Sequence, residues 1–496
     1  MTYILAIDQG TSSTKTILFD QDGRPFARGS EPLKTHYLPN GFVEQDAEAI
    51  VENVLASLKK CLDDFSVKGG NLNDIKACGI SNQRETFVLW DDQGVPLCNA
   101  VVWQCKRSIG ICQRMKGEGL EAAIRSATGL LIDPYFSGTK LIWLYENNKK
   151  VRDAIDAGSA YFGTVDTWLL YNLTKKKNYC TDFTNASRTL FFNLNDLNWD
   201  KSLLEIFGLT NLKLPQPKNS SAYYGQTDFN GLLPSEISIS AMIGDSHAAA
   251  FGEGCFAPGA AKATLGTGCS IMMNIGDLPK ESKNGMVTTI CWSTENEIRY
   301  ALEGVIVTCG GTIEWLKNEL RLFSDSSETE AMATAVADNG GVYVIPAFSG
   351  LGAPHWDMNR KGSIAGLTFG TNRNHIVRAA LESIPYQIKD VVMAMEADTT
   401  IGLHQLMVDG GISSNNFIIQ FLAELLQKPV VNIGMPDVSA LGAAYLAGLQ
   451  QGIFKDLDHL TKLNTENKIT KPSGNETLKR SYEGWQQVIR AGKNHH

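Results

Sequence analysis

The chain has 496 residues, 43% of them hydrophobic and 20% charged, and a formal net charge of -8. The length predicts two large domains, and the composition is typical of a soluble globular protein. The acidic balance excludes a strongly basic surface for nucleic acid, and no stretch approaches the roughly 20 apolar residues of a membrane helix. Ten cysteines without a CxxC pair indicate free thiols in a reducing compartment, so we expect a cytoplasmic protein.

The chain begins with a pattern of short apolar strands and turns. Residues 4–7 and 17–19 are predicted strands, and Asp22-Gly23 after the second of them is typical of a hairpin turn. A helix is predicted to begin near Asp46, because apolar residues then recur at helical spacing, at Ile50, Val54, Leu58 and Leu62. Strands are predicted again at 75–80 and 87–90, so the chain is of the mixed α/β class.

A second α/β unit is predicted to begin around residues 239–243, with a clear strand, turn and strand over 263–272. The expected domains are 1–250, 251–460 and a tail over 461–496. Within that last region, residues 460–474 are predicted to be loop and a last helix is predicted around Trp485.

The segment Asp8-Gln9-Gly10-Thr11-Ser12-Ser13-Thr14-Lys15 is a candidate phosphate-binding turn. Gly10 lets the backbone approach a ligand, and the amides and hydroxyls of the turn are donors for phosphate oxygens. Asp8 is a candidate for holding Mg²⁺ through water, the usual mode for this ion. The alternative is a Ser/Thr-rich hairpin without a ligand. It is not a Walker loop, because no GxxxxGK[ST] pattern is present.

Two glycine-rich turns follow later in the chain. Leu265-Gly266-Thr267-Gly268 is a candidate for clamping phosphates from the other side, and Val408-Asp409-Gly410-Gly411 would let a flat adenine lie against the backbone. Either turn alone is more often structural. All three turns in this order favour a nucleotide site.

The order Asp-x-Gly-Thr, Gly-Thr-Gly, Asp-Gly-Gly resembles the ATPase fold shared by actin, hexokinases and sugar kinases. Residues 135–147 and 362–382 are similar to the signatures of the FGGY carbohydrate kinases. This resemblance implies a two-domain α/β fold of the actin-like (ribonuclease H-like) ATPase type, with a cleft between the domains. It covers nearly the whole chain up to about Gly448.

Within that family the chain looks like the glycerol kinases. The segments that carry this likeness are 82–86, 102–105, 132–140, 163–168, 184–189 and 350–354. The resemblance implies phosphorylation of a small polyol by ATP with Mg²⁺, with glycerol converted to sn-glycerol 3-phosphate in glycerol catabolism. It also implies a homo-oligomer, dimer or tetramer. From the charge balance and the lack of a long apolar stretch we expect neither nucleic-acid binding nor membrane insertion.

The resemblance also implies roles for individual residues. Arg84 and Glu85 would grip the substrate hydroxyls, since a guanidinium donates and a carboxylate accepts. Tyr135 would add a hydroxyl contact, Trp103 would line the carbon chain, and Asp245 would be the catalytic base and a possible metal ligand. The positions that match nucleotide contacts are Thr11, Ser12, Ser13, Lys15, Thr267, Gly310, Glu314, Gly411 and Asn415.

Two positions depart from the glycerol kinase pattern. Ser246 stands where a substrate-binding glutamine is usual, and Ser270 stands where a phenylalanine packs on the glycerol carbons. Losing that ring removes an apolar wall worth about 1–3 kcal/mol. Both serines are retained as substrate-binding candidates, because their hydroxyls could bind a longer substrate. A kinase for a tetritol, pentitol or ketose is therefore the alternative within the family.

Two alternatives lie outside polyol kinases. An actin-like filament or chaperone ATPase would share the phosphate turns but would not need Arg84, Glu85, Trp103 and Tyr135. A silent polyol sensor would have lost its base or a phosphate turn, and this chain retains both. His247 is expected to be a packed, hydrogen-bonded residue, since a lone histidine makes no metal site.

Overall fold

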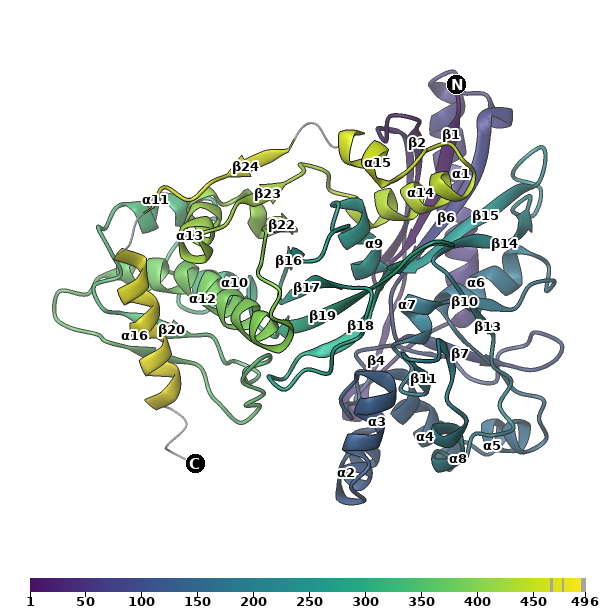
Figure 1. Cartoon of the computed structure of the whole chain (residues 1–496), viewed down its shortest axis with the longest axis horizontal. Helices are drawn as coiled ribbons and strands as arrows, with labels where there is room; N and C mark the ends of the chain where they lie inside the picture. The colour runs from purple at the N-terminus through teal and green to yellow at the C-terminus, as the bar shows by residue number, and fades with distance from the viewer. Residues whose placement is uncertain (464–466, 475–476, 492–496) are drawn as a thin grey trace.

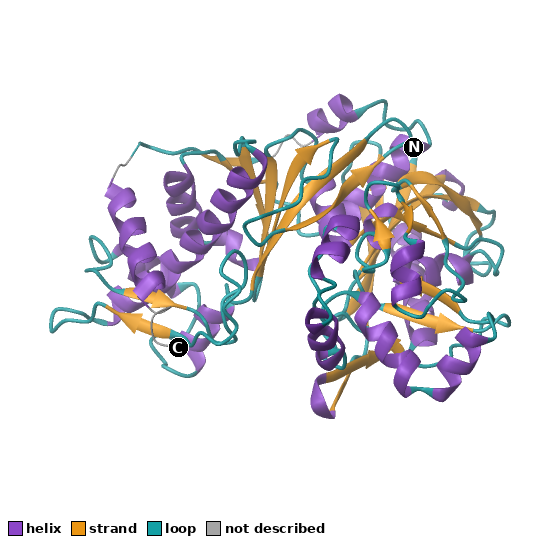
Figure 2. Ribbon diagram, turned by 60° about the horizontal axis from the view of Figure 1, so that its bottom comes forward, coloured by secondary structure: helices purple, strands orange, loops and turns teal. Residues whose placement is uncertain are grey.

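The computed structural model describes residues 1–463, 467–474 and 477–491. Two large mixed sheets occupy separate halves of the molecule, with helices packed around each (Figures 1 and 2). The predicted two-domain α/β class is therefore confirmed.

The first half is organised by a six-stranded sheet. Its strands, in spatial order, are β14 (Ser221–Thr227), β15 (Ile237–Gly244), β6 (Ile75–Asn82), β1 (Tyr3–Gln9), β2 (Ser13–Asp20) and β3 (Pro25–Pro32). β1 is almost wholly buried because it runs between β6, to which it is parallel, and β2, to which it is antiparallel. Helix α1 (Ala47–Val67) covers β2 and β3, and its predicted start is confirmed by the Asp46 side chain, which accepts from two backbone amides of the first turn.

The strand β15 corrects the prediction that a second unit begins around residues 239–243. β15 pairs in parallel with β6, so it completes the first sheet. An apolar run identifies a buried strand, but it does not tell to which sheet the strand belongs.

A smaller five-stranded sheet and a group of short helices extend the first half. The sheet contains, in spatial order, β4 (His36–Leu38), β5 (Phe42–Gln45), β8 (Ala100–Val101), β7 (Phe87–Trp90) and β9 (Tyr161–Thr164). The helices are α2 (Ile109–Gly117), α3 (Glu121–Thr128), α4 (Ser137–Asn147), α5 (Lys149–Asp156), α6 (Val165–Leu173), α7 (Phe183–Ala186), α8 (Lys201–Ile206) and α9 (Asp245–Gly252). Two short strand pairs, β10 (Cys180–Asp182) with β13 (Gln216–Lys218) and β11 (Phe192–Asn193) with β12 (Asn198–Trp199), complete it.

The second half is organised by a seven-stranded sheet. Its spatial order is β18 (Val287–Ser293), β19 (Ile298–Ile306), β17 (Cys269–Gly276), β16 (Ala260–Leu265), β22 (Gln405–Asp409), β23 (Val430–Asn432) and β24 (Lys468–Thr470). The helices of this half are α10 (Gly311–Asn318), α11 (Glu328–Thr334), α12 (Arg373–Thr399) and α13 (Asn416–Leu426), beside the strand pair β20 (Tyr343–Ile345) and β21 (Ser363–Ala365). The buried faces of β16, β17, β19 and β22 share one core with α12.

Helix α14 (Val438–Gln450) packs on the first sheet, although β22 and β23 of the second sheet precede it in the chain (Figure 1). Its small residues permit this closeness. A Cβ on Gly442 would lie 1.9 Å from the Ala248 carbonyl oxygen of α9, and one on Gly79 of β6 would lie 2.2 Å from that of Ala443. These close contacts hold α14 against α9 and β6.

The C-terminal region is partly corrected. Residues predicted to be loop contain the end of α15 (Leu457–Leu463) and the edge strand β24, while the predicted last helix is α16 (Thr477–Ala491). β24 is short, polar and half exposed, so it lacks the alternation of apolar and polar residues from which a strand can be predicted. Residues 464–466, 475–476 and 492–496 of the predicted tail lie outside the described residues.

All ten cysteines are free thiols, and only Cys98 is not fully buried. Within the described ranges, no helix has both the length and the apolar character needed to cross a bilayer.

Candidate active site

The parallel strands β1, β6 and β15 end at the same edge of the first sheet, and this edge faces the second sheet. Register pairs Asp8 with Ser81, and Ser81 with Ile243, so the residues that follow these strands meet there. A cavity of about 290 Å³ opens at this edge. It is lined by every residue predicted to bind the polyol, namely Arg84, Glu85, Trp103, Tyr135, Asp245, Ser246 and Ser270, together with Thr11.

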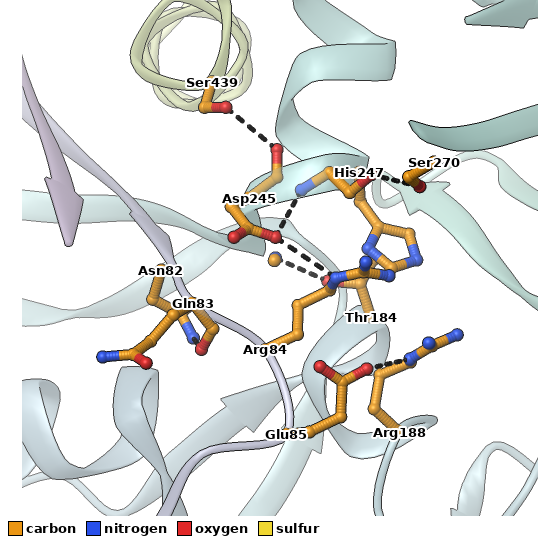
Figure 3. A network of polar contacts seen from close by, with 12 residues as sticks. Asn82, Gln83, Arg84, Glu85, Thr184, Arg188, Asp245, His247, Ser270 and Ser439 are labelled. Carbon is orange, nitrogen blue, oxygen red and sulfur yellow. Dashed lines mark hydrogen bonds and ion pairs between the residues drawn. The ribbon is translucent and has the colours of Figure 1, made fainter. Parts of the chain in front are cut away.

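The turn after β6 presents Arg84 and Glu85 to this cavity. Glu85 has a φ of +60°, a left-handed conformation that costs a non-glycine residue free energy. Ser137 Oγ donates to the Glu85 carbonyl at 2.8 Å, and Arg188 Nε lies 2.5 Å from Glu85 Oε1, so surrounding groups hold the strained turn in place. Figure 3 shows Arg84 pointing toward Asp245 and Glu85 facing Arg188.

Arg84 and Glu85 belong to a buried ionic network that joins the two halves. Glu303 of β19 lies 2.9 Å from Arg84 Nη2 and 2.7 Å from Arg188 Nη1. All four side chains are almost fully buried. Burial alone would raise the pKa of Glu303, but the Arg188 and Arg84 guanidiniums hold it well below its ordinary value. Burial raises the pKa of Glu85, and this effect is larger than the lowering effect of the same two arginines.

Arg84 retains a donor for a ligand. Its Nη1 is buried and has no hydrogen-bond partner among the described residues. An unpaired guanidinium nitrogen in a cavity wall is costly unless a ligand oxygen accepts from it.

Trp103 and Tyr135 form an aromatic wall of the cavity. Their ring centroids are 5.6 Å apart with planes inclined at 71°. Trp103 Nε1 donates to Thr11 Oγ1 at 2.9 Å, so the indole ties the wall to the candidate phosphate turn. An aromatic face with polar groups at its margin suits a short carbon chain that carries hydroxyls.

Asp245 is the first residue of α9, and its side chain remains 40% exposed at the cavity. Arg84 Nε lies 3.2 Å from Oδ1, and the Ser246 amide donates to the same oxygen at 2.6 Å. Ser439 of α14 donates to the Asp245 carbonyl (Figure 3). The carboxylate is therefore oriented, and it is open to a ligand hydroxyl, as a general base must be.

His247 is packed as predicted. It is fully buried, and Nε2 lies 3.3 Å from Thr289 Oγ1. Burial and the nearby Arg84 lower its pKa well below the usual range, so the ring is neutral.

A second cavity of about 550 Å³ lies in the second half. It is lined by five predicted nucleotide positions, Thr267, Gly310, Glu314, Gly411 and Asn415. A Cβ on Gly310 would lie 2.6 Å from Ile412 Cδ1 and 2.8 Å from the Gly266 carbonyl, so only glycine lets these turns close around the space. The cavity is large enough for an adenosine.

The other predicted nucleotide positions lie on the first β-hairpin. Thr11, Ser12 and Ser13 form the tip between β1 and β2, and Thr11 lines the smaller cavity. Lys15 Nζ instead lies 2.9 Å from Asp437 Oδ1, and Arg28 pairs with the other oxygen of Asp437 at 3.0 Å. The Lys15 ammonium thus pairs with Asp437, the residue before α14, in this conformation.

Asp8 lies at the same edge and suits a hydrated cation. Burial and the neighbouring Asp245 carboxylate raise its pKa to about 6, against the effects of Lys15 and of the Ser81 hydroxyl, which donates to Asp8 at 3.1 Å. Two carboxylates that oppose each other's ionisation fit a Mg²⁺ ion that keeps most of its water. Among the described residues, no group of three or more histidine, cysteine, aspartate or glutamate side chains is placed to hold a metal ion.

We expect Asp8→Asn to stabilise the protein in a pH-dependent way. Because the pKa of Asp8 is higher when folded than its unfolded value of about 3.9, the folded state binds the proton more tightly, and stability is lost as pH rises toward 6. Thermal scans without divalent cations should show a Tm gain over wild type that grows by about 1–3 °C between pH 4.5 and 7. Exposed Asp277→Asn is the matched control; a gain independent of pH would contradict the assignment.

Several lining residues were not predicted. They are Lys262, Thr264, Asp409 and Ser439 in the cavity wall, and Arg188 and Glu303 behind it. Lys262 and Glu303 had a detectable signal, a charge within an otherwise apolar strand, which requires a buried partner.

Comparison with known proteins gives a consistent result over the whole chain. The model of the N-terminal domain of the FGGY family of carbohydrate kinases matches residues 3–252, and that of the C-terminal domain matches residues 261–450. The chain is 46% identical over 98% of its length to a glycerol kinase of Carboxydothermus hydrogenoformans, of which 97% is covered. It is 45% identical over 99% of its length to glycerol kinase 2 of Thermotoga maritima, of which 98% is covered.

Solved structures give the same fold. The crystal structure of Plasmodium falciparum glycerol kinase with ADP superposes with a TM-score of 0.94 at 34% identity, covering 99% of this chain and 98% of that one. A ligand-bound xylulose kinase from Lactobacillus acidophilus superposes with a TM-score of 0.90 at 22% identity, covering 100% and 99%, which supports the fold alone.

Proposed function

The chain belongs to the FGGY family of carbohydrate kinases, and from this premise we propose that it transfers the γ-phosphoryl group of ATP to a terminal hydroxyl of glycerol, giving sn-glycerol 3-phosphate. The observation that carries the proposal is the first cavity. Arg84, Glu85, Trp103, Tyr135 and Asp245 line it together, and the second cavity has the size and glycine-rich walls that a nucleotide needs.

In the proposed reaction these side chains have separate tasks. Arg84 Nη1 donates to one substrate hydroxyl, Glu85 accepts from another, and Trp103 supports the carbon chain. Asp245 accepts the proton of the terminal hydroxyl as that oxygen bonds to the γ-phosphorus and the bond to ADP breaks. Mg²⁺, held through water by Asp8 and near Asp245, would neutralise charge on the phosphates.

A coupled ADP-release assay with Mg·ATP tests the proposal. We expect glycerol-dependent turnover well above the rate with ATP and water alone, because closure around the acceptor excludes water from the phosphoryl group. Growth of filaments with ATP, measured by light scattering, is not expected. Absence of ADP release with glycerol and with every longer polyol or ketose would refute the kinase assignment.

We also propose features that follow from the predicted organisation. The N-terminal domain would span 1–250, the C-terminal domain 251–460 and a tail 461–496, in a homo-oligomer of two or four subunits. The free buried cysteines support a cytoplasmic location. Gel filtration with light scattering measures the oligomeric state directly.

A further inference from the structure

Lys262 of β16 is a buried cation in the wall of the first cavity, and the reaction described above gives it no task. It is 1% exposed, and its Nζ donates to Ser246 Oγ at 2.6 Å and to Thr264 Oγ1 at 2.8 Å. Both of these partners are hydroxyl oxygens and neither is a carboxylate. An ammonium has three donors, so one N–H is left for a ligand.

The two serines that depart from the glycerol kinase pattern continue from this lysine in a hydrogen-bonded row. Ser246 Oγ lies 3.3 Å from Ser270 Oγ, and Ser270 donates to Glu303 Oε1 at 3.2 Å. Ser270 has one proton and gives it to the carboxylate, so Ser246 must be the donor between the serines. The row therefore runs in one direction, from Lys262 through Ser246 and Ser270 to Glu303.

The direction of this row determines which hydrogen-bond donors and acceptors of the cavity wall remain free for a ligand. Each serine oxygen accepts one hydrogen bond in the row and keeps a second lone pair free, while Lys262 keeps one N–H. A hydroxyl group both donates and accepts, so it matches a serine oxygen and the ammonium together. A carboxylate only accepts, and it would meet the serine lone pairs without a proton to share.

Small side chains leave room for such a group beside the proposed base. Ala249, one turn of α9 after Ser246, also lines the cavity. Ser246 directly follows Asp245 in α9, and Ala249 and Ser270 are also small, so an acceptor longer than glycerol would extend along this wall.

We propose that Lys262, Ser246 and Ser270 form a subsite for one further hydroxyl, so that the enzyme phosphorylates four-carbon polyols as well as glycerol. This rests on the proposed kinase function. Lys262 and the two serines are then specificity residues, which act on the relative kcat/KM of the acceptors.

The first test uses the native protein with Mg·ATP and three acceptors: glycerol, erythritol and butane-1,2,3-triol, a four-carbon chain without the fourth hydroxyl. We expect erythritol to reach within about tenfold of glycerol in kcat/KM and to exceed the triol at least about tenfold, because a site that hydrogen-bonds a hydroxyl discriminates against its absence. Equal kcat/KM values for erythritol and the triol, or a kcat/KM for erythritol below about a hundredth of that for glycerol, would overturn the subsite. Turnover of glycerol in the same experiment would still support the kinase function.

Other outcomes also decide between the two proposals. ADP release with erythritol but not glycerol would support the subsite and replace glycerol as the acceptor. No release with any of the three would refute the proposed function and the subsite together.

Variants then locate the effect. Ser270→Phe fills the subsite and Lys262→Met removes its donor, so each should lower the erythritol-to-glycerol ratio of kcat/KM at least about tenfold. Ser126→Ala, at an exposed serine of α3, is the control and should leave the ratio within about twofold. If Lys262→Met lowered kcat for both acceptors equally, Lys262 would act on the phosphoryl group and the subsite would be wrong.

Discussion

Asp245→Asn should lower kcat for glycerol phosphorylation by about 10³-fold, the largest effect on turnover that we expect from one substitution. Positioned general bases contribute about 10²–10⁴-fold, and an amide cannot take the substrate proton. The substitution is nearly isosteric, and the Ser246 amide can still donate to its oxygen. KM for glycerol should therefore change only a few fold. Steady-state kinetics with coupled ADP detection measures both constants.

Two comparisons make this result specific. Exposed Asp277→Asn controls for loss of one carboxylate charge and should retain wild-type kcat. Calorimetric binding of glycerol to Asp245→Asn would show that the site still forms. Turnover within tenfold of wild type would mean that another group takes the proton and that Asp245 is misassigned.

Glu303→Gln should cause the largest loss of stability. Glu303 is the anion between Arg84 and Arg188, and removing one charge from a buried ion network costs about 3–5 kcal/mol because it leaves the partners uncompensated. The midpoint of thermal unfolding should fall by roughly 5–10 °C. KM for glycerol should also rise, since Arg84 loses the contact that fixes its position.

Glu297, the residue before β19, offers a matched control for Glu303. Its pair with Arg299 is 2.6 Å long but partly exposed, and exposed pairs contribute only about 0–1 kcal/mol. Glu297→Gln should therefore shift the midpoint by no more than about 1–2 °C. Equal shifts for the two variants would show that the buried network contributes no special stability.

Much of the fold follows from local patterns. The helix after Asp46 and the strand 75–80 were predictable because a capping carboxylate and continuous apolar runs act over a few residues. The sheet to which β15 belongs and the strand β24 were not, because strand partners are chosen by contacts far away in the sequence.

In the candidate site, too, some residues could be predicted from local motifs and others could not. Arg84 and Asp245 stand in motifs that resemble a family, so their meeting in one cavity could be predicted. Lys262 and Glu303 gain their importance from partners on other strands and helices, with Glu303 reaching across to Arg84 and Arg188. Sequence shows a charge in an apolar strand, but only the fold shows which groups satisfy it.

The packing of α14 on the first sheet determines which parts of the molecule can move together as one body. Because Gly442 and Gly79 let this helix lie against α9 and β6, it travels with the first sheet even though β22 and β23 precede it. Opening and closing of the cleft would then rotate the body around the second sheet against the first sheet plus α14. The hinges would include the short links at 253–259 and 433–437, the second of which ends at Asp437, which pairs with Lys15 and Arg28.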